Sequence, residues 1–138
     1  MVSELITFGT MFTMLQHLHR PLQIEIASFF GLPYQILEQW LFTLNYVRNV
    51  CAHNVRLWNR RLGICPMIPS VKKHPEWKDI HNDRPFMILL ILRALLNVCA
   101  PSSNWHLRME QLFDEYNALP ISCMGFPNDW RANVLWKR

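Results

Sequence analysis

Apolar positions along the chain recur with the period of helices rather than strands. In residues 4–18 they return every three or four positions, as on one face of an amphipathic helix, and Ser3 is placed to cap its N-terminus. The same spacing predicts helices over 23–30, over 34–54 with a continuation to 62, over 86–99 and over 105–119. Breakers separate these runs: Pro21, Gly31, Gly63 and Pro101. We therefore predict an all-α fold, a bundle of about five helices.

Two of these helices have distinct apolar patterns. The segment 86–99 is apolar on nearly every face, which is typical of a helix central to a bundle or buried in a dimer. The helix over 105–119 follows a capping serine, Ser102 or Ser103. We expect this helix to bury one face, formed by Leu107, Leu112, Phe113 and Tyr116.

Two segments lack helical periodicity. Residues 64–84 contain Pro66, Pro69 and Pro75, and we expect an ordered but irregular loop, long for a compact domain and therefore a candidate functional segment. Residues 120–138 are too apolar for a loose end. We expect them to pack back onto the bundle as a strap, through Met124, Phe126, Trp130, Leu135 and Trp136.

Length and composition narrow the class of protein. The 138 residues, half of them hydrophobic, suit a single domain over 1–138. With four glycines and no glycine-rich motif, the common nucleotide-binding loops are absent. The longest apolar run, 86–92, is too short to cross a membrane. The N-terminus lacks the basic region that is typical of a signal peptide, so we expect no signal peptide. We expect a cytoplasmic protein with four reduced, mostly buried cysteines.

Positive charge is concentrated in one part of the chain. The net charge is +4, yet no acidic residue occurs between Glu38 and Glu76. Six basic residues lie in that gap: Arg48, Arg56, Arg60, Arg61, Lys72 and Lys73. Such a local field attracts polyanions, nucleic acid first. The alternative is a solvated basic face without a ligand.

The candidate chemistry lies in residues 44–60, a polar stretch on an otherwise core-forming helix. On a continuous helix, Asn49, His53 and Arg56 share one stripe at i, i+4 and i+7, with Arg60 one turn further. Arg48 lies roughly 140° around the same helix from His53. A second helix, from this chain or from a second copy, must therefore complete a site that uses both.

These side chains suit metal-independent cleavage of RNA. A histidine titrates near neutral pH and can transfer a proton. An arginine binds a phosphate and stabilises the charge that develops on it, and an asparagine can orient either group. Together they could assist attack of a 2′-hydroxyl on its own phosphodiester. The alternative is that His53 is an ordinary helix histidine and that the arginines are surface residues.

The same residues carry a family resemblance. The spacing from Arg48 to His53 is the R-x-x-x-x-H signature of HEPN ribonuclease domains, and the string Arg-Asn-x-Cys-Ala-His-x-x-Arg-Leu-Trp-Asn-Arg resembles the Abi-like family of phage abortive-infection proteins, the AbiD/AbiF type. Residues 3–10, 30–33 and 124–127 are also similar to segments of that family. Since family members are usually longer, we expect that this chain could correspond to the C-terminal half of one.

The resemblance implies a HEPN-like homodimer in which two R-x-x-x-x-H motifs meet. It implies RNA as substrate, no metal or cofactor, and a role in phage defence or toxin–antitoxin arrest, with an antitoxin or regulatory RNA as a further partner. In this family His53 would be the general acid/base, Arg48 would bind the scissile phosphate and Asn49 would position them. Flanking phosphates would contact Arg56, Asn59, Arg60 and Arg61.

Other interpretations stay open. The chain could be a non-catalytic module that binds RNA or a partner, or a structural dimerisation domain. Cys51 and His53 could be half of a zinc site, but no second pair has ligand spacing. His74 and His81 in the loop could contact substrate. Tryptophans could stack on bases, although tryptophans in small bundles more often lie in the core or an interface.

Overall fold

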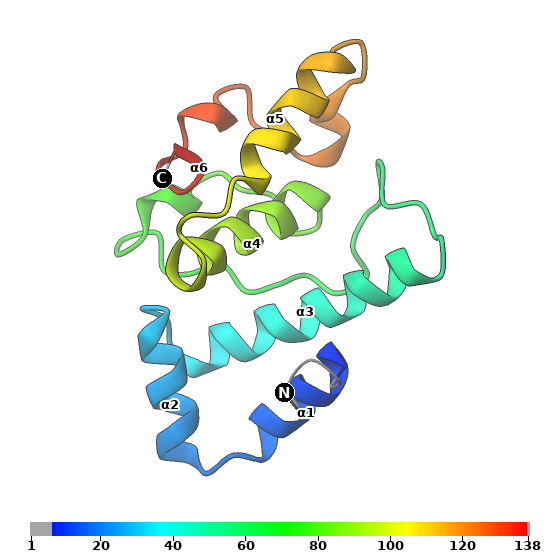
Figure 1. Cartoon of the computed structure of the whole chain (residues 1–138). Helices are drawn as coiled ribbons and strands as arrows, with labels where there is room; N and C mark the ends of the chain where they lie inside the picture. Colours follow the sequence, from blue (N-terminus) through cyan, green and yellow to red (C-terminus); the bar gives the residue numbers. More distant parts are fainter. Residues whose placement is uncertain (1–6, 138) are drawn as a thin grey trace.

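The computed structural model describes residues 7–137, which form helices and irregular segments without a strand. The α-helices are α1 (Phe8–His17), α2 (Arg20–Phe29), α3 (Tyr34–Ala52), α4 (Pro85–Cys99), α5 (Trp105–Glu115) and α6 (Val134–Lys137). Short 3₁₀ turns are η2 (Pro75–Trp77), η3 (Ile121–Met124) and η4 (Trp130–Ala132). The long α3 crosses the molecule, with α1 and α2 on one side and α4, α5 and α6 on the other (Figure 1). The prediction of an all-α bundle is confirmed.

The first two helices begin and end at residues suited to those positions. Thr7 caps α1, since its side-chain oxygen accepts a hydrogen bond from the N–H of Thr10 at 3.2 Å. The predicted cap, Ser3, lies outside the described residues. Pro21 was expected to separate two helices, but it lies in the first turn of α2, where a missing N–H costs nothing. Gly31 follows α2 at φ 68° and closes it, as predicted.

The core forms around α4 and includes the C-terminal segment. The fully buried side chains of α4 include Phe86, Met87, Leu90 and Ile91. Trp130 and Trp136 pack into the same cluster, and the side-chain amide of Asn97 donates to the carbonyl of Leu135 at 3.0 Å. The predicted apolar strap is therefore present.

The connection between α3 and α4, residues 53–84, is irregular but well anchored. Leu62, Trp77 and Ile80 are buried in the core cluster. The indole N–H of Trp40 on α3 donates to the carbonyl of Met67 at 2.8 Å. The connection is thus an integral part of the packing between the two halves of the molecule.

Three predictions about burial and capping are wrong. On α5, Leu107, Leu112 and Tyr116 are about half exposed, and only Phe113 of the predicted face packs against the core. Asn104 rather than a serine precedes the first turn of α5. The thiols of Cys51, Cys65 and Cys99 are exposed rather than buried, since each occurs where an element ends or in the connection.

The described part of the chain contains no helix that could span a membrane. No helix within residues 7–137 combines the length and the apolar character needed to cross a bilayer.

Candidate functional site

The candidate site lies where α3 ends. The helix stops at Ala52 because Asn54 adopts a left-handed conformation, with φ 54°, which asparagine tolerates better than most residues. The N–H groups of Asn54 and Val55 then donate back to the carbonyls of Cys51 and Val50, at 3.0 and 3.1 Å. This is the hydrogen-bond pattern of a Schellman motif. The predicted continuation of the helix to residue 62 is therefore wrong.

The early end of α3 changes how the predicted residues are grouped. His53 caps the helix, is exposed, and its N–H donates to the carbonyl of Asn49 at 3.1 Å. Arg56 and Arg60 lie in the irregular segment beyond it. The expected stripe of four residues on one helix face thus extends only from Asn49 to His53.

Arg48 is exposed on the last turns of α3 and is held by its neighbour. Its Nη1 atom donates to the side-chain oxygen of Asn49 at 3.0 Å. Within the described residues it makes no hydrogen bond to His53. This agrees with the expectation that one helix does not bring Arg48 and His53 together.

The other predicted phosphate-binding residues are only partly free. Arg61 lies 3.7 Å from the carboxylate of Asp83, and the side-chain oxygen of Asn59 accepts a weak 3.4 Å hydrogen bond from Arg84. Arg56 and Arg60 form no ion pair among residues 7–137. Arg48, Arg56 and Arg60 are therefore the basic groups available to a polyanion here.

Two apolar hollows flank this basic segment, and sequence reasoning missed both. The smaller, about 290 Å³, has Arg48 at its edge and is otherwise lined by Phe8, Leu44, Val47, Ile88 and Leu92. The larger, about 430 Å³, lies between α4, α5 and the segment after His53, and we call it the α4–α5 groove. Its lining is apolar: Leu57, Trp58, Pro85, Ile88, Leu89, Met109, Leu112, Phe113, Tyr116, Leu119 and Met124.

Ile88 lines both hollows, so they are neighbours, and the smaller one reaches Arg48. The sequence contained a clue to these hollows, because α5 carries more apolar residues than one buried face can use.

In the described part of the chain, no group of three His, Cys, Asp or Glu side chains is close enough to hold a metal ion.

The comparisons with known proteins agree with the resemblance noted from the residues. Residues 1–59 match the family model of Abi-like proteins, a region that includes Arg48, Asn49, His53, Arg56 and Asn59. No curated protein and no solved structure matches the chain. Residues 1–59 of the chain are therefore similar to Abi-like proteins, and this similarity suggests, at a coarse level, abortive infection, a form of phage defence.

Proposed function

We propose that this Abi-like chain is a metal-independent endoribonuclease of phage defence or toxin type, with a HEPN-type Arg/His site. The observation that carries the proposal is the arrangement at the end of α3. Arg48 and His53 are both exposed and five positions apart, and Arg48 lines the smaller apolar hollow. They lie in the region matched by the family model.

The proposed reaction is transesterification within the RNA strand. The imidazole of one His53 takes the proton of a 2′-hydroxyl, whose oxygen bonds to the adjacent phosphorus. The bond from phosphorus to the 5′-oxygen breaks, and a protonated imidazole returns a proton to that oxygen. Arg48 neutralises the charge on the phosphate oxygens in the transition state. The products are a 2′,3′-cyclic phosphate and a 5′-hydroxyl.

A dimer would supply the pairing of Arg48 with His53 that one chain lacks. Because Asn49 holds Arg48, Arg48 and His53 of the same chain form no hydrogen bond to each other within residues 7–137. Two copies that cover the apolar hollows would bring two sets of these residues together, and would remove the exposed side chains of Leu112 and Tyr116 from water. A homodimer formed through this surface is therefore part of the proposal.

The test is cleavage of an end-labelled RNA in EDTA by the wild type, by His53→Ala and by a control variant. His19→Ala removes the histidine that directly precedes α2, in the turn between α1 and α2 and away from the end of α3. We expect His53→Ala to lower the rate by about 100-fold or more, as for loss of a general acid/base, with RNA binding retained. The products of the wild type should carry 2′,3′-cyclic phosphates.

The outcomes separate the proposal from its alternatives. Binding that falls steeply with salt, without turnover by any variant, would support a non-catalytic RNA-binding module instead. Absence of RNA binding would leave a partner-binding or dimerisation domain. Equal cleavage by wild type and His53→Ala would place the chemistry at other residues.

A further inference from the structure

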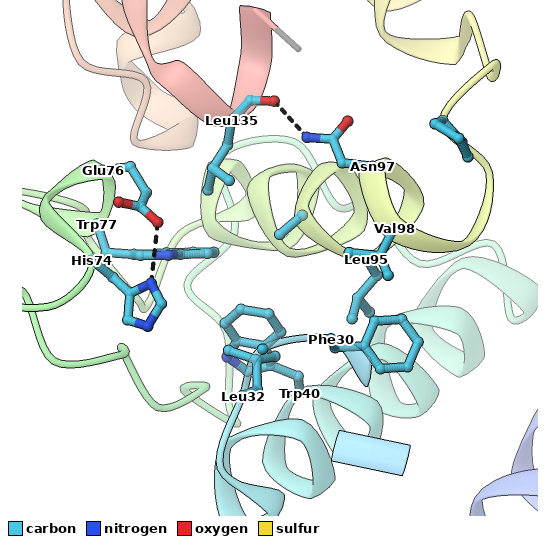
Figure 2. A pocket seen from close by; sticks show the side chains of 13 residues that line it. Phe30, Leu32, Trp40, His74, Glu76, Trp77, Leu95, Asn97, Val98 and Leu135 are labelled. Atoms are coloured by element: carbon cyan, nitrogen blue, oxygen red, sulfur yellow. Dashed lines mark hydrogen bonds and ion pairs between the residues drawn. The ribbon is translucent and has the colours of Figure 1, made fainter. Parts of the chain in front are cut away.

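A third hollow, of about 270 Å³, lies away from the candidate site, beside the N-terminal half of α3. The turn between α2 and α3 lines one side through Phe30 and Leu32. The C-terminal half of α4 and the segment around η2 line the rest, with His74, Glu76 and Trp77 from the latter. Figure 2 shows His74 and Trp77 on one side, Phe30 and Leu95 on the other, and Trp40 and Leu32 between them. None of these residues belongs to the candidate site.

The aromatic base of this hollow is fixed. Trp40 and Trp77 are only 1% and 2% exposed, and their ring centroids are 5.0 Å apart. The indole N–H of Trp40 is bonded to Met67, so that ring cannot turn without losing a hydrogen bond. Phe30 and His74 offer partly exposed rings on opposite sides. Rigid aromatic walls suit a planar ligand better than a flexible one.

Polar groups at this hollow suit a planar ligand that forms hydrogen bonds at its edge. The Nδ1 atom of His74 lies 3.3 Å from the carboxylate of Glu76, which leaves Nε2 without a partner in the described residues. The side-chain amide nitrogen of Asn97 is used by Leu135, which leaves its oxygen as an acceptor. Nucleobases combine a flat aromatic ring with donors and acceptors around its edge.

Two lysines lie next to His74 in the chain, although neither of them lines the hollow. Lys72 and Lys73 are exposed and precede His74 in the chain. The carbonyl of Ser70 accepts hydrogen bonds from the N–H groups of Lys73 and His74, both at 2.9 Å, which fixes the lysines in a turn. Neither lysine forms an ion pair within residues 7–137. An anionic group attached to a ligand in the hollow would meet these two cations by extending past His74.

We propose that this hollow binds one nucleotide, with the base between Phe30 and His74 and the phosphate at Lys72 and Lys73. The nucleotide could be a free mononucleotide or one unit of an RNA strand. Only the RNA form rests on the proposed function. Binding of a free nucleotide requires neither cleavage at His53 nor a dimer.

The test uses calorimetric titration with adenosine 5′-monophosphate, ribose 5-phosphate and a short single-stranded RNA. Ala94 lines the hollow from α4, and Ala94→Met would fill it. Ala118→Met is the matched control, because Ala118 is exposed and lines none of the hollows described here. We expect Ala94→Met to weaken binding by about tenfold or more, as for loss of one stacked base. Ala118→Met should bind as the wild type does.

The pattern of ligands that bind shows whether the site takes a free nucleotide or one nucleotide of an RNA strand. Binding of adenosine monophosphate, at least about tenfold tighter than ribose 5-phosphate, supports a free nucleotide site. Binding of RNA alone, weakened by Ala94→Met, supports a base of the strand. If Ala94→Met changes neither affinity, or if no ligand binds to the wild type, the nucleotide site is wrong.

A folding failure would not obscure the result. Circular dichroism would show whether Ala94→Met folds, and Val98→Trp, at an exposed position on the edge of the hollow, is a second blocking variant. Cleavage measured in parallel reports on the proposed ribonuclease alone. A wild type that binds adenosine monophosphate without cutting RNA would contradict only the proposed function, and cleavage without nucleotide binding would contradict only this inference.

Discussion

The guanidinium of Arg48 donates a hydrogen bond to the side-chain oxygen of Asn49, the next residue in the chain, at 3.0 Å. Neighbouring residues on a helix point about 100° apart, so this contact requires both side chains to lean toward each other. The backbone carbonyl of Asn49 also accepts the N–H of His53. Asn49 is therefore the residue that connects the two predicted catalytic groups.

This link makes Asn49 a positioning residue for Arg48. We expect Asn49→Ala to lower kcat by about tenfold, the cost of one hydrogen bond to a charged group, with little change in KM. Asn49→Asp keeps an acceptor oxygen and should restore most of the rate. Single-turnover and steady-state cleavage would measure both variants. A loss of equal size in both would show that the hydrogen bond to Arg48 is not what matters.

The proposed homodimer gives a prediction at the α4–α5 groove. Leu112→Glu places a charge among apolar side chains, and we expect it to raise the dimer dissociation constant by about tenfold or more. Leu107→Glu is the matched control on the same helix, because Leu107 is equally exposed but does not line the groove. Sedimentation equilibrium would report both values, and RNA cleavage should fall with dimerisation. A wild type that stays monomeric at high concentration would contradict this prediction.

A partly buried basic pair predicts sensitivity to acid. Arg93 on α4 is fully buried, and one of its nitrogens lies 3.5 Å from Nε2 of His106 on α5. Burial lowers the pKa of His106 below its usual 6.5, and the charge of Arg93 lowers it further. Above pH 6.5 the imidazole is neutral in both folded and unfolded states. Below it the unfolded state takes up the proton first, so the free energy of unfolding should fall with pH.

The variant that tests this pair is His106→Phe, which keeps a ring beside Trp136. Urea unfolding at pH 7.5 and 5.5 would measure the loss of stability in each protein. We expect a smaller loss in His106→Phe than in the wild type, while His19→Ala should lose as much as the wild type. An unchanged loss in His106→Phe would assign the acid sensitivity to other groups.

Two glycines should respond in opposite ways to the same substitution. Gly125 follows η3 at φ 84°, and a Cβ atom there would lie 2.5 Å from Cβ of Arg84. Gly125→Ala should therefore lower the free energy of unfolding by about 1–3 kcal/mol. Gly9 lies in α1 with ordinary contacts only, so Gly9→Ala should stabilise by about 0.5–1 kcal/mol. Denaturant unfolding of both variants would measure the change in the free energy of unfolding. Changes of equal size and sign would contradict this prediction.

The sequence predicts the helical class and most helix positions because those depend on local spacing and on residues such as Gly31. It does not predict where α3 ends. Apolar residues continue past Ala52 at helical spacing, yet Leu57 and Trp58 pack toward α4 and α5 rather than continuing the face of α3. Periodicity shows that a side chain is apolar, but it does not show which element it will contact.

The candidate site was predictable to a similar extent. Arg48, Asn49 and His53 could be identified by residue type and spacing, and the separation of Arg48 from His53 follows from helix geometry. The pairing of Arg61 with Asp83 was not predictable, because it depends on the path of the connection. The exposed face of α5 was also missed, since a pattern of apolar residues does not distinguish a core from a surface awaiting a partner.

The connection between α3 and α4 has a consequence for exchange of amide protons with solvent. The N–H of Leu62 donates to the carbonyl of Asp83 at 2.8 Å, although neither residue lies in a regular element. Leu62 is buried, as are Trp77 and Ile80. The amides of Leu62 and of Trp77, which donates to His74, should therefore exchange only when the core opens, at rates close to those of α4, while the amides of Val71 and Lys72 exchange quickly. A segment without helix or strand would then belong to the same cooperative unit as the helices it joins.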